Sequence, residues 1–409
     1  MSDRLVTLLK VLVLLFFLAV TAFFTAMTVD GFRQPAVTAE ENGGGTDNSN
    51  GAGAQRPTFL DALKDLEGFS VRHLRQVWEL GIPGEVYLAA DGDALYASSS
   101  TGAIFCIDAV TGAVRWSYNL GGWISARPVI SKGIVYLGSA NHFLYALDAQ
   151  TGALLWFFQA QGEILSTPVE SEGIVFFFAD NDSVFDLANR LYALDARSGV
   201  QLWAYDTKSW TASPPAVNGD AAFIGGSKSE VMALEKSTGK VIWSRQVDSV
   251  VFSSPCINGT RVLFSTANGW LYSLDAATGE LLWQRNISAF TPTSPLAVGD
   301  NLYILSYQGK LTALSLENGN PRWTLLDAGE LADAPASPDN LLYTFAPRGV
   351  ITWIESSSGK RRGALLAPHD FAAAPLLHEG RVYAASSDGM VRAYRTADGT
   401  PFAGIASPR

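Results

Sequence analysis

Cysteine, histidine and charged side chains are scarce in this chain of 409 residues. It has 2 cysteines and 4 histidines, and 17% of its residues are charged. Cys106 and Cys256 stand far apart and form no metal-binding or redox pattern, so we expect two buried free thiols. No histidine is spaced from a nucleophile in a recognisable catalytic pattern, which leaves no candidate catalytic residue.

Basic side chains are outnumbered by acidic ones. The 29 lysines and arginines face 39 aspartates and glutamates, which gives a net charge of −10. Nucleic acids and anionic lipid headgroups are bound by basic surfaces, so this balance disfavours both. The hydrophobic fraction of 48%, in contrast, is ample for a large core.

The N-terminal residues 1–32 contain a long hydrophobic run. Val11–Val29 has 19 residues without a charge, about the length that crosses a bilayer. We expect an inner-membrane anchor, with Arg4 and Lys10 favouring a cytoplasmic N-terminus, or a signal segment. The rest of the chain would then lie in the periplasm or outside the cell, and it would be secreted if the segment is cleaved.

Two short segments follow the hydrophobic run. Residues 33–56 are rich in glycine and small polar side chains that cannot bury a core, so we expect a disordered linker. Residues 57–75 predict a short helical lead-in, in which Phe59, Leu60 and Leu63 form an apolar stripe. This lead-in is expected either to pack on the following domain or to bind a partner.

One segment, Leu144–Trp156, recurs along the rest of the chain. Its turn glycine returns at positions 112, 152, 199, 239, 279, 319, 359 and 399, with six spacings of 40 residues and one of 47. A proline keeps the same interval from Pro128 to Pro375. Two markers in phase indicate a structural repeat.

The repeat has the local chemistry of β-strands. Its runs are short, β-branched and aromatic, and they fall at 133–140, 143–148, 155–159 and, before the proline, Ile164–Val169. Four strands in each of eight repeats predict an all-β fold, an eight-bladed β-propeller of four-stranded blades over residues 76–409.

Each repeat also carries a tight turn and a tryptophan. Asp148 can accept backbone hydrogen bonds and Gly152 can adopt a positive φ, which predicts a turn into the outer strand. Trp156 is expected to cover the seam to the next blade. The last repeat lacks its tryptophan, so we expect Trp78 to supply the outer strand of blade eight; the alternative is that Pro401–Ala406 fills this position.

The Ala-x-Asp-x-x-Thr-Gly-x-x-x-Trp pattern of these repeats resembles the PQQ-type β-propeller repeat. Two branches of that family are relevant. One is the quinoprotein alcohol dehydrogenases, and the other is the BamB-like lipoprotein of the outer-membrane β-barrel assembly machinery, a scaffold without a cofactor. The chain is similar to the second branch in size and blade count, although no cysteine near its N-terminus can carry a lipid anchor.

Variation between repeats gathers on one face of the expected ring, where loops enter the innermost strands. The residues five positions before each proline are expected to surround the central channel. The candidates for partner or ligand binding at this channel mouth are Trp123, Glu163, Trp210, Phe290, Glu330 and Asp370. An aromatic and acidic mouth suits a peptide, a cation or a basic partner segment, unless its aromatic residues only cap the channel and its acids are solvated.

The seven additional residues of the third repeat form a second candidate site. They fall in the loop 179–190, and the residues expected to face a partner are Asp182, Phe185, Asp186 and Leu187. The aspartates are also of the type that binds calcium, but their spacing is not that of an EF-hand, so no metal site is predicted.

These observations favour a membrane-tethered, extracytoplasmic propeller that acts as a non-catalytic scaffold for another envelope protein, in envelope or outer-membrane protein assembly. We expect no cofactor and no nucleic-acid partner. The alternative is a module that binds and senses a ligand or polymer. A PQQ-dependent dehydrogenase is disfavoured, because the resemblance to those enzymes implies an adjacent cysteine pair that Cys106 and Cys256 do not form.

Overall fold

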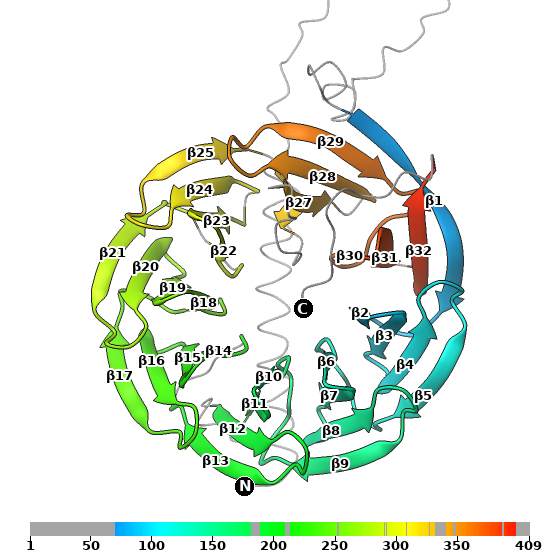
Figure 1. Ribbon diagram of the computed structural model, residues 1–409, viewed down its shortest axis with the longest axis horizontal. Coiled ribbons are helices and arrows are strands. Elements are labelled where there is room, and N and C mark those ends of the chain that lie inside the picture. The colour runs from blue at the N-terminus through cyan, green and yellow to red at the C-terminus, as the bar shows by residue number, and fades with distance from the viewer. Residues whose placement is uncertain are drawn as a thin grey trace, which may run out of the picture. The chain divides into compact units, whose positions relative to one another are not determined.

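The computed structural model shows strands and tight turns arranged as a ring of blades (Figure 1). It describes residues 70–180, 189–208, 213–251, 253–289, 291, 293–307, 309–326, 328–331, 341–346, 349–386 and 388–397. The predicted segments 1–32 and 33–56, and the lead-in up to residue 69, lie outside these ranges. No helix within the ranges has the length and hydropathy needed to cross a membrane.

Six blades are separate four-stranded sheets with antiparallel neighbours. In each, the chain runs from the innermost to the outermost strand (Figure 1). Blade 1 contains β2 (Val86–Asp91), β3 (Ala94–Ser99), β4 (Ala103–Asp108) and β5 (Val114–Asn119). Blade 2 contains β6 (Val129–Ser131), β7 (Ile134–Gly138), β8 (Phe143–Asp148) and β9 (Leu154–Gln159). Blade 3 contains β10 (Val169–Ser171), β11 (Ile174–Ala179), β12 (Arg190–Asp195) and β13 (Gln201–Asp206). Blade 4 contains β14 (Ala216–Asn218), β15 (Ala221–Gly225), β16 (Glu230–Glu235) and β17 (Val241–Gln246). Blade 5 contains β18 (Cys256–Asn258), β19 (Arg261–Ser265), β20 (Trp270–Asp275) and β21 (Leu281–Asn286). Blade 6 contains β22 (Leu296–Val298), β23 (Asn301–Leu305), β24 (Leu311–Ser315) and β25 (Pro321–Leu325).

Blades 7 and 8 share one eight-stranded sheet, because the first strand of the described residues joins them. Blade 7 contains β26 (Glu330–Leu331), β27 (Leu341–Ala346), β28 (Val350–Glu355) and β29 (Arg361–Leu366). Blade 8 contains β30 (Leu376–His378), β31 (Arg381–Ala385), β32 (Met390–Thr396) and, as its outer strand, β1 (Ser70–Gly81).

The strand β1 closes the ring. It pairs antiparallel with β32 from Leu74 to Gly81, and parallel with β29 from Ser70 to His73. The prediction of eight blades, with the strand of Trp78 as the outer strand of the last, is therefore confirmed, and the position considered for Pro401–Ala406 is occupied by β1. Since β1 begins at Ser70, the boundary predicted at residue 76 is six residues late.

Seven tryptophans cover the seams between blades, as predicted for Trp156. Each lies on an outer strand and donates its Nε1–H to a backbone carbonyl in the turn of the next blade. The pairs, at 2.8–3.2 Å, are Trp78–Ala109, Trp116–Ala149, Trp156–Ala196, Trp203–Lys236, Trp243–Ala276, Trp283–Leu316 and Trp323–Ser356. The turn residue that packs against each indole must be a glycine for two reasons. Gly152 has a φ of 73°, and a Cβ at this position would lie 2.6 Å from Trp116 Cδ2.

The predicted turn chemistry is also present. Asp148 Oδ1 accepts hydrogen bonds from the backbone N–H of Gln150 (3.1 Å) and from both the N–H and the hydroxyl of Thr151 (2.7 Å each). The hydroxyl and backbone of Thr151 hold the pKa of Asp148 below its usual value. The turn is therefore satisfied by its own side chains.

The innermost strands begin later than predicted. In blade 3 this strand is β10, which starts after Pro168, so the strand expected at Ile164–Val169 is wrong. Proline has no N–H to donate to a ladder, and pairing starts once it has passed. Ile164 is instead fully buried against Gly138, where an added Cβ would lie 2.2 Å from its Cγ2.

The core lies between neighbouring blades as separate apolar clusters. In one of them Tyr136 and Leu144 of blade 2 pack with Phe177 and Tyr192 of blade 3. Cys106 is a buried free thiol between blades 1 and 2, as predicted. Cys256 is free but only partly buried, so that part of the prediction is wrong: it starts the three-residue innermost strand of blade 5, all of whose residues are partly exposed.

Candidate functional site

The connections of the ring fall on two opposite faces, because successive strands of a blade are antiparallel. The turns between third and fourth strands, such as Asp148–Gly152, lie on one face. The connections that enter the innermost strands, and those between second and third strands, open on the other. We call this second face the variable face, since its connections differ most in sequence.

Three candidate mouth residues are described with their side chains. Trp123 is 49% exposed, Asp370 is exposed and Glu163 is partly buried. The carbonyls of Trp123 and Glu163 accept equivalent hydrogen bonds, from the N–H of Ala140 (2.9 Å) and of Asp180 (3.0 Å). The two residues therefore occupy the same position in neighbouring blades, on the variable face.

The remaining candidates stay predictions. Glu330 starts β26, but only its backbone is described. The others lie outside the described residues: Trp210, Phe290, Asp182, Phe185, Asp186 and Leu187.

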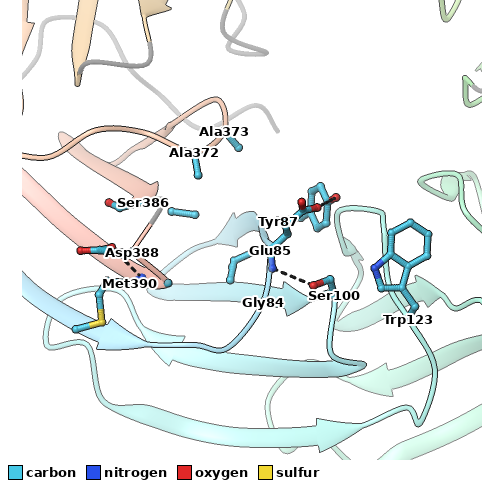
Figure 2. A pocket seen from close by; sticks show the side chains of 13 residues that line it. Gly84, Glu85, Tyr87, Ser100, Trp123, Ala372, Ala373, Ser386, Asp388 and Met390 are labelled. Atoms are coloured by element: carbon cyan, nitrogen blue, oxygen red, sulfur yellow. Dashed lines mark hydrogen bonds between the residues drawn. The ribbon is translucent and has the colours of Figure 1, made fainter. Parts of the chain in front are cut away.

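A hollow of about 800 Å³ opens beside Trp123, between blades 8, 1 and 2 (Figure 2). Its walls come from variable-face connections: the entries into β2, β6 and β30, and the links β3–β4 and β31–β32. The side chains that give it polarity or bulk are Glu85, Tyr87, Ser100, Trp123, Asp388 and Met390. Of the described candidate mouth residues, Trp123 is the one that lines it.

Glu85 is fixed by its backbone and exposes its carboxylate. Its N–H donates to Ser100 Oγ (2.9 Å), and its carbonyl accepts from the N–H of Ser100 (2.8 Å). The hydroxyl of Tyr87 donates to Glu85 Oε2 (3.3 Å). Burial, and then the charge of Glu85, raise the pKa of Tyr87, so the phenol remains a proton donor at neutral pH.

The negative charge of Asp388 is balanced by the buried guanidinium of Arg392. The Arg392 side chain, 6% exposed, donates to both carboxylate oxygens of Asp388 (2.9 and 2.6 Å) and to Glu79 Oε2 (3.1 Å). The contact with Arg392 lowers the pKa of Asp388. Nearby, the side chain of Ser386 is buried in the wall of the hollow.

This lining suits binding. Ser100 Oγ accepts a backbone hydrogen bond, and no histidine lines the hollow. His378 Nε2 is bonded to the carbonyl of Gly92 (2.7 Å), and His369 Nδ1 to the hydroxyl of Tyr394 (3.3 Å). The described lining residues therefore include no nucleophile paired with a histidine.

Sequence reasoning missed Glu85. Its carbonyl accepts the same hydrogen bond that Trp123 accepts in the next blade, but the proline used as a marker is absent from blade 1. The turn glycine carried the missing signal. Counting back from Gly112 by the distance that separates Trp123 from Gly152 reaches Pro83, two residues before Glu85.

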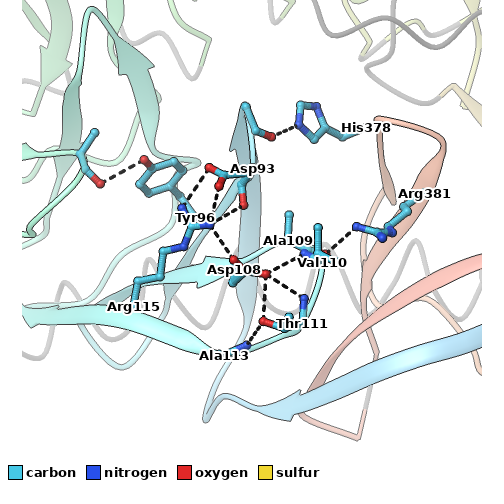
Figure 3. Close-up of polar contacts among 12 residues, drawn as sticks. Asp93, Tyr96, Asp108, Ala109, Val110, Thr111, Ala113, Arg115, His378 and Arg381 are labelled. Carbon is cyan, nitrogen blue, oxygen red and sulfur yellow. Dashed lines mark hydrogen bonds and ion pairs between the residues drawn. The ribbon is translucent and has the colours of Figure 1, made fainter.

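The opposite face is occupied by structural contacts at the seam of blades 8 and 1 (Figure 3). Arg115 donates to Asp93 (2.7 Å) and Asp108 (2.6 Å), and it holds the pKa of Asp108 well below its usual range. The carbonyl of Ala109 accepts from Tyr383 (3.0 Å) as well as from the seam tryptophan. These polar groups maintain the turn and the closure of the ring.

The described residues do not fit a quinone site of the dehydrogenase type. Cys106 lies in blade 1 and Cys256 in blade 5, so they do not form an adjacent pair. Among the described residues, no three histidine, cysteine, aspartate or glutamate side chains are grouped to hold a metal ion.

The fold and site define an eight-bladed propeller with one uniform and one variable face. The model of the family described as outer membrane protein assembly factor BamB matches residues 66–185, 125–209 and 187–334. The chain therefore belongs to the BamB-like family of PQQ-type β-propeller repeats. No curated protein sequence matches it.

Solved structures share the fold at low identity. BamB from Moraxella catarrhalis is 20% identical, with a TM-score of 0.65 over 79% of this chain and 99% of that one. The computationally designed Ika8 protein is 16% identical (TM-score 0.66, 80% and 98%), and quinohemoprotein alcohol dehydrogenase from Comamonas testosteroni is 14% identical (0.61, 82% and 78%). These likenesses confirm the propeller and carry no activity with them.

Proposed function

We propose that this chain is a membrane-tethered, extracytoplasmic scaffold without catalytic activity, which binds another envelope protein or complex during envelope or outer-membrane protein assembly. Membership of the BamB-like family supports the role. The apolar run in residues 1–32 supports the tether, and the net charge of −10 argues against a nucleic-acid partner.

The contrast between the two faces carries this proposal. On the uniform face, turns such as Asp148–Gly152 satisfy their own polar groups. On the variable face, Trp123 is half-exposed beside a hollow. Large aromatic side chains are enriched among the residues that contribute most to protein–protein binding, so the variable face is the better docking surface.

Photocrosslinking in native membranes tests the scaffold. A photoreactive amino acid would replace Trp123 in the full-length chain, and the matched control would replace Gln150, which is exposed in a uniform-face turn. We expect a discrete adduct from position 123 alone, whose partner mass spectrometry then identifies. Silence from both positions, or equal adducts from both, would overturn the proposal.

The tether and the location need their own test. Protease would be added to intact cells and then to cells with a permeabilised outer envelope. If the propeller is extracytoplasmic, one of these two treatments should digest it. Alkaline extraction should leave the chain in the membrane if residues 1–32 are retained. A ring protected until the inner membrane is lysed would contradict the assignment.

The hollow of about 800 Å³ also favours the alternative of a ligand- or polymer-binding sensor, since small-molecule sites have this size. Cell-wall fragments would then raise the melting temperature of the wild type but not of Trp123→Ala. The dehydrogenase reading predicts stoichiometric quinone binding and calcium-dependent dye reduction, and we expect neither.

A further inference from the structure

The charge of the hollow has one sign. The charged side chains among its described lining residues are Glu85 and Asp388, both acidic. Asp388 is engaged at both oxygens by Arg392, whereas within the described part of the chain the carboxylate of Glu85 receives a single hydrogen bond, from Tyr87 at 3.3 Å. Glu85 therefore has more unused acceptor capacity than Asp388 and no cation beside it among the described residues, because an ionised carboxylate has about four lone-pair sites.

Two aromatic side chains line the hollow together with this carboxylate. Tyr87 lies beside Glu85, and Trp123 stands beyond Ser100 along the same opening (Figure 2). Indole is the aromatic group that attracts cations most strongly, through the negative face of its ring. The half-exposed ring of Trp123 and the carboxylate of Glu85 therefore favour the same class of ligand, a cation with an apolar stem.

The size and polarity of the hollow narrow this class. A volume of about 800 Å³ far exceeds that of a metal ion, and the described residues include no three-ligand group to hold one. Met390 offers apolar contact, and the buried hydroxyl of Ser386 is a further hydrogen-bonding group in the lining. A lysine or arginine side chain matches such a site, since it combines a hydrocarbon stem with several donors.

We propose that the hollow between blades 8, 1 and 2 binds a lysine or arginine side chain in an extended basic segment of a partner protein. This inference rests on the proposed scaffold function and names the chemistry that the scaffold recognises. The net charge of −10 would accelerate the approach of such a segment at low ionic strength.

Calorimetric titration of the full-length protein in detergent tests the charge requirement. The probe is a short peptide with two lysines in a glycine and serine background, and its partner probe carries the same lysines Nε-acetylated. We expect the lysine peptide to bind at least about tenfold more tightly than the acetylated one, because acetylation removes the charge and the cation–π donor. Equal affinity, or no binding at millimolar peptide, would overturn the proposal.

Two variants and one control place the binding in the hollow. Glu85→Gln removes the charge while keeping the backbone bonds to Ser100, and should weaken lysine-peptide binding about threefold to fivefold. Trp123→Ala should weaken it about tenfold. Glu280→Gln removes an exposed acid on the uniform face and should leave binding unchanged. If Glu85→Gln and Glu280→Gln behave alike, the hollow is not the site.

Crosslinking separates this inference from the proposed function. If position 123 still captures its partner in the Glu85→Gln background and the lysine peptide does not bind, the scaffold stands and the basic-ligand inference fails. If the peptide binds as expected but position 123 captures nothing in membranes, the hollow is a cation site and the scaffold function fails.

Discussion

Gly363 on β29 lies opposite Trp353 on β28, which reverses the pairing of the other seven blades. In those blades an outer-strand tryptophan lies opposite a small residue on the strand beside it. The pairs are Trp78–Ala393, Trp116–Cys106, Trp156–Ala146, Trp203–Ala193, Trp243–Ala233, Trp283–Ser273 and Trp323–Ala313. The exchange removes the bulky side chain from the edge of blade 7, so that Ser70 can pair beside Gly363 and Arg72 can lie 6.0 Å from the ring centre of Trp353.

Gly363→Ala should destabilise the propeller by about 1–3 kcal/mol, the usual cost of overpacking. The new Cβ would lie 2.1 Å from Trp353 Cζ2 and 2.3 Å from the carbonyl oxygen of Ser70. Urea unfolding measures the loss. Gly81→Ala on β1 is the control, because its nearest neighbour is Met390 Sδ at 3.5 Å, and it should change the unfolding free energy by less than about 0.5 kcal/mol. Equal effects of the two substitutions would contradict the packing argument.

Trp78→Ala should cost about 3–5 kcal/mol, as expected for a large buried side chain. Trp78 is 8% exposed and bonds to Ala109 across the seam where the ring closes. Hydrogen exchange should show the largest loss of protection in β1 and β32. Trp123→Ala, which removes an exposed ring of the same type, should alter stability by less than about 0.5 kcal/mol. A destabilisation by Trp123→Ala that matched that of Trp78→Ala would show that closure has no special dependence on Trp78.

Stability should fall in acid. The hydrogen bonds of Arg115 to Asp108, and those of the turn residues to Asp148 and Asp195, lower the pKa values of these carboxyls in the folded state. Their contribution is therefore fully present above the unfolded value of about 3.9 and is lost as the pH falls through the folded values. Melting temperatures should be level between about pH 7 and pH 5 and should drop below about pH 4.

Asp108→Asn separates this effect from general acid unfolding. It should lower the melting temperature near neutral pH and make the further fall in acid smaller than in the wild type, because one shifted carboxyl is gone. Asp300→Asn, at an exposed aspartate of blade 6, is the matched control. An acid-induced fall in Asp108→Asn as large as in the wild type would argue against the Arg115 contact as its source.

The two thiols should differ in reactivity. Burial raises the pKa of the Cys106 thiol to about 11 and also raises that of Cys256, which is nevertheless only partly covered. Because the thiolate is the reactive form, iodoacetamide at about pH 8 should label Cys256 slowly and Cys106 only after denaturation. Mass spectrometry of digested protein measures both rates. Rapid labelling of Cys106 in the folded protein would contradict its burial.

Most of the architecture was predictable because the same local sequence pattern recurs in each repeat. The turn of Asp148 and Gly152, the seam role of Trp156 and the closing role of Trp78 all follow from local chemistry that recurs at a fixed period. The innermost strands lie later than predicted, because the expected range Ile164–Val169 contains Pro168 and the observed strand β10 begins only after it. The candidate site was only partly predictable: counting from the turn glycine Gly112 places Glu85 near the position that Trp123 holds in the next blade, but only folding brings both residues to one hollow with Asp388.

The sequence by itself determined the number of blades and the chemistry of each turn, because these depend on short-range patterns and on repetition; for the closing strand it left two candidates, the strand of Trp78 and Pro401–Ala406. Only the tertiary structure decided which residues come into contact where the ring closes. It placed Ser70 beside Gly363, and it brought Glu85, Trp123 and Asp388, from three blades, around one hollow. Such contacts depend on how blades 7, 8, 1 and 2 meet, and no local pattern encodes the meeting of segments that lie hundreds of residues apart.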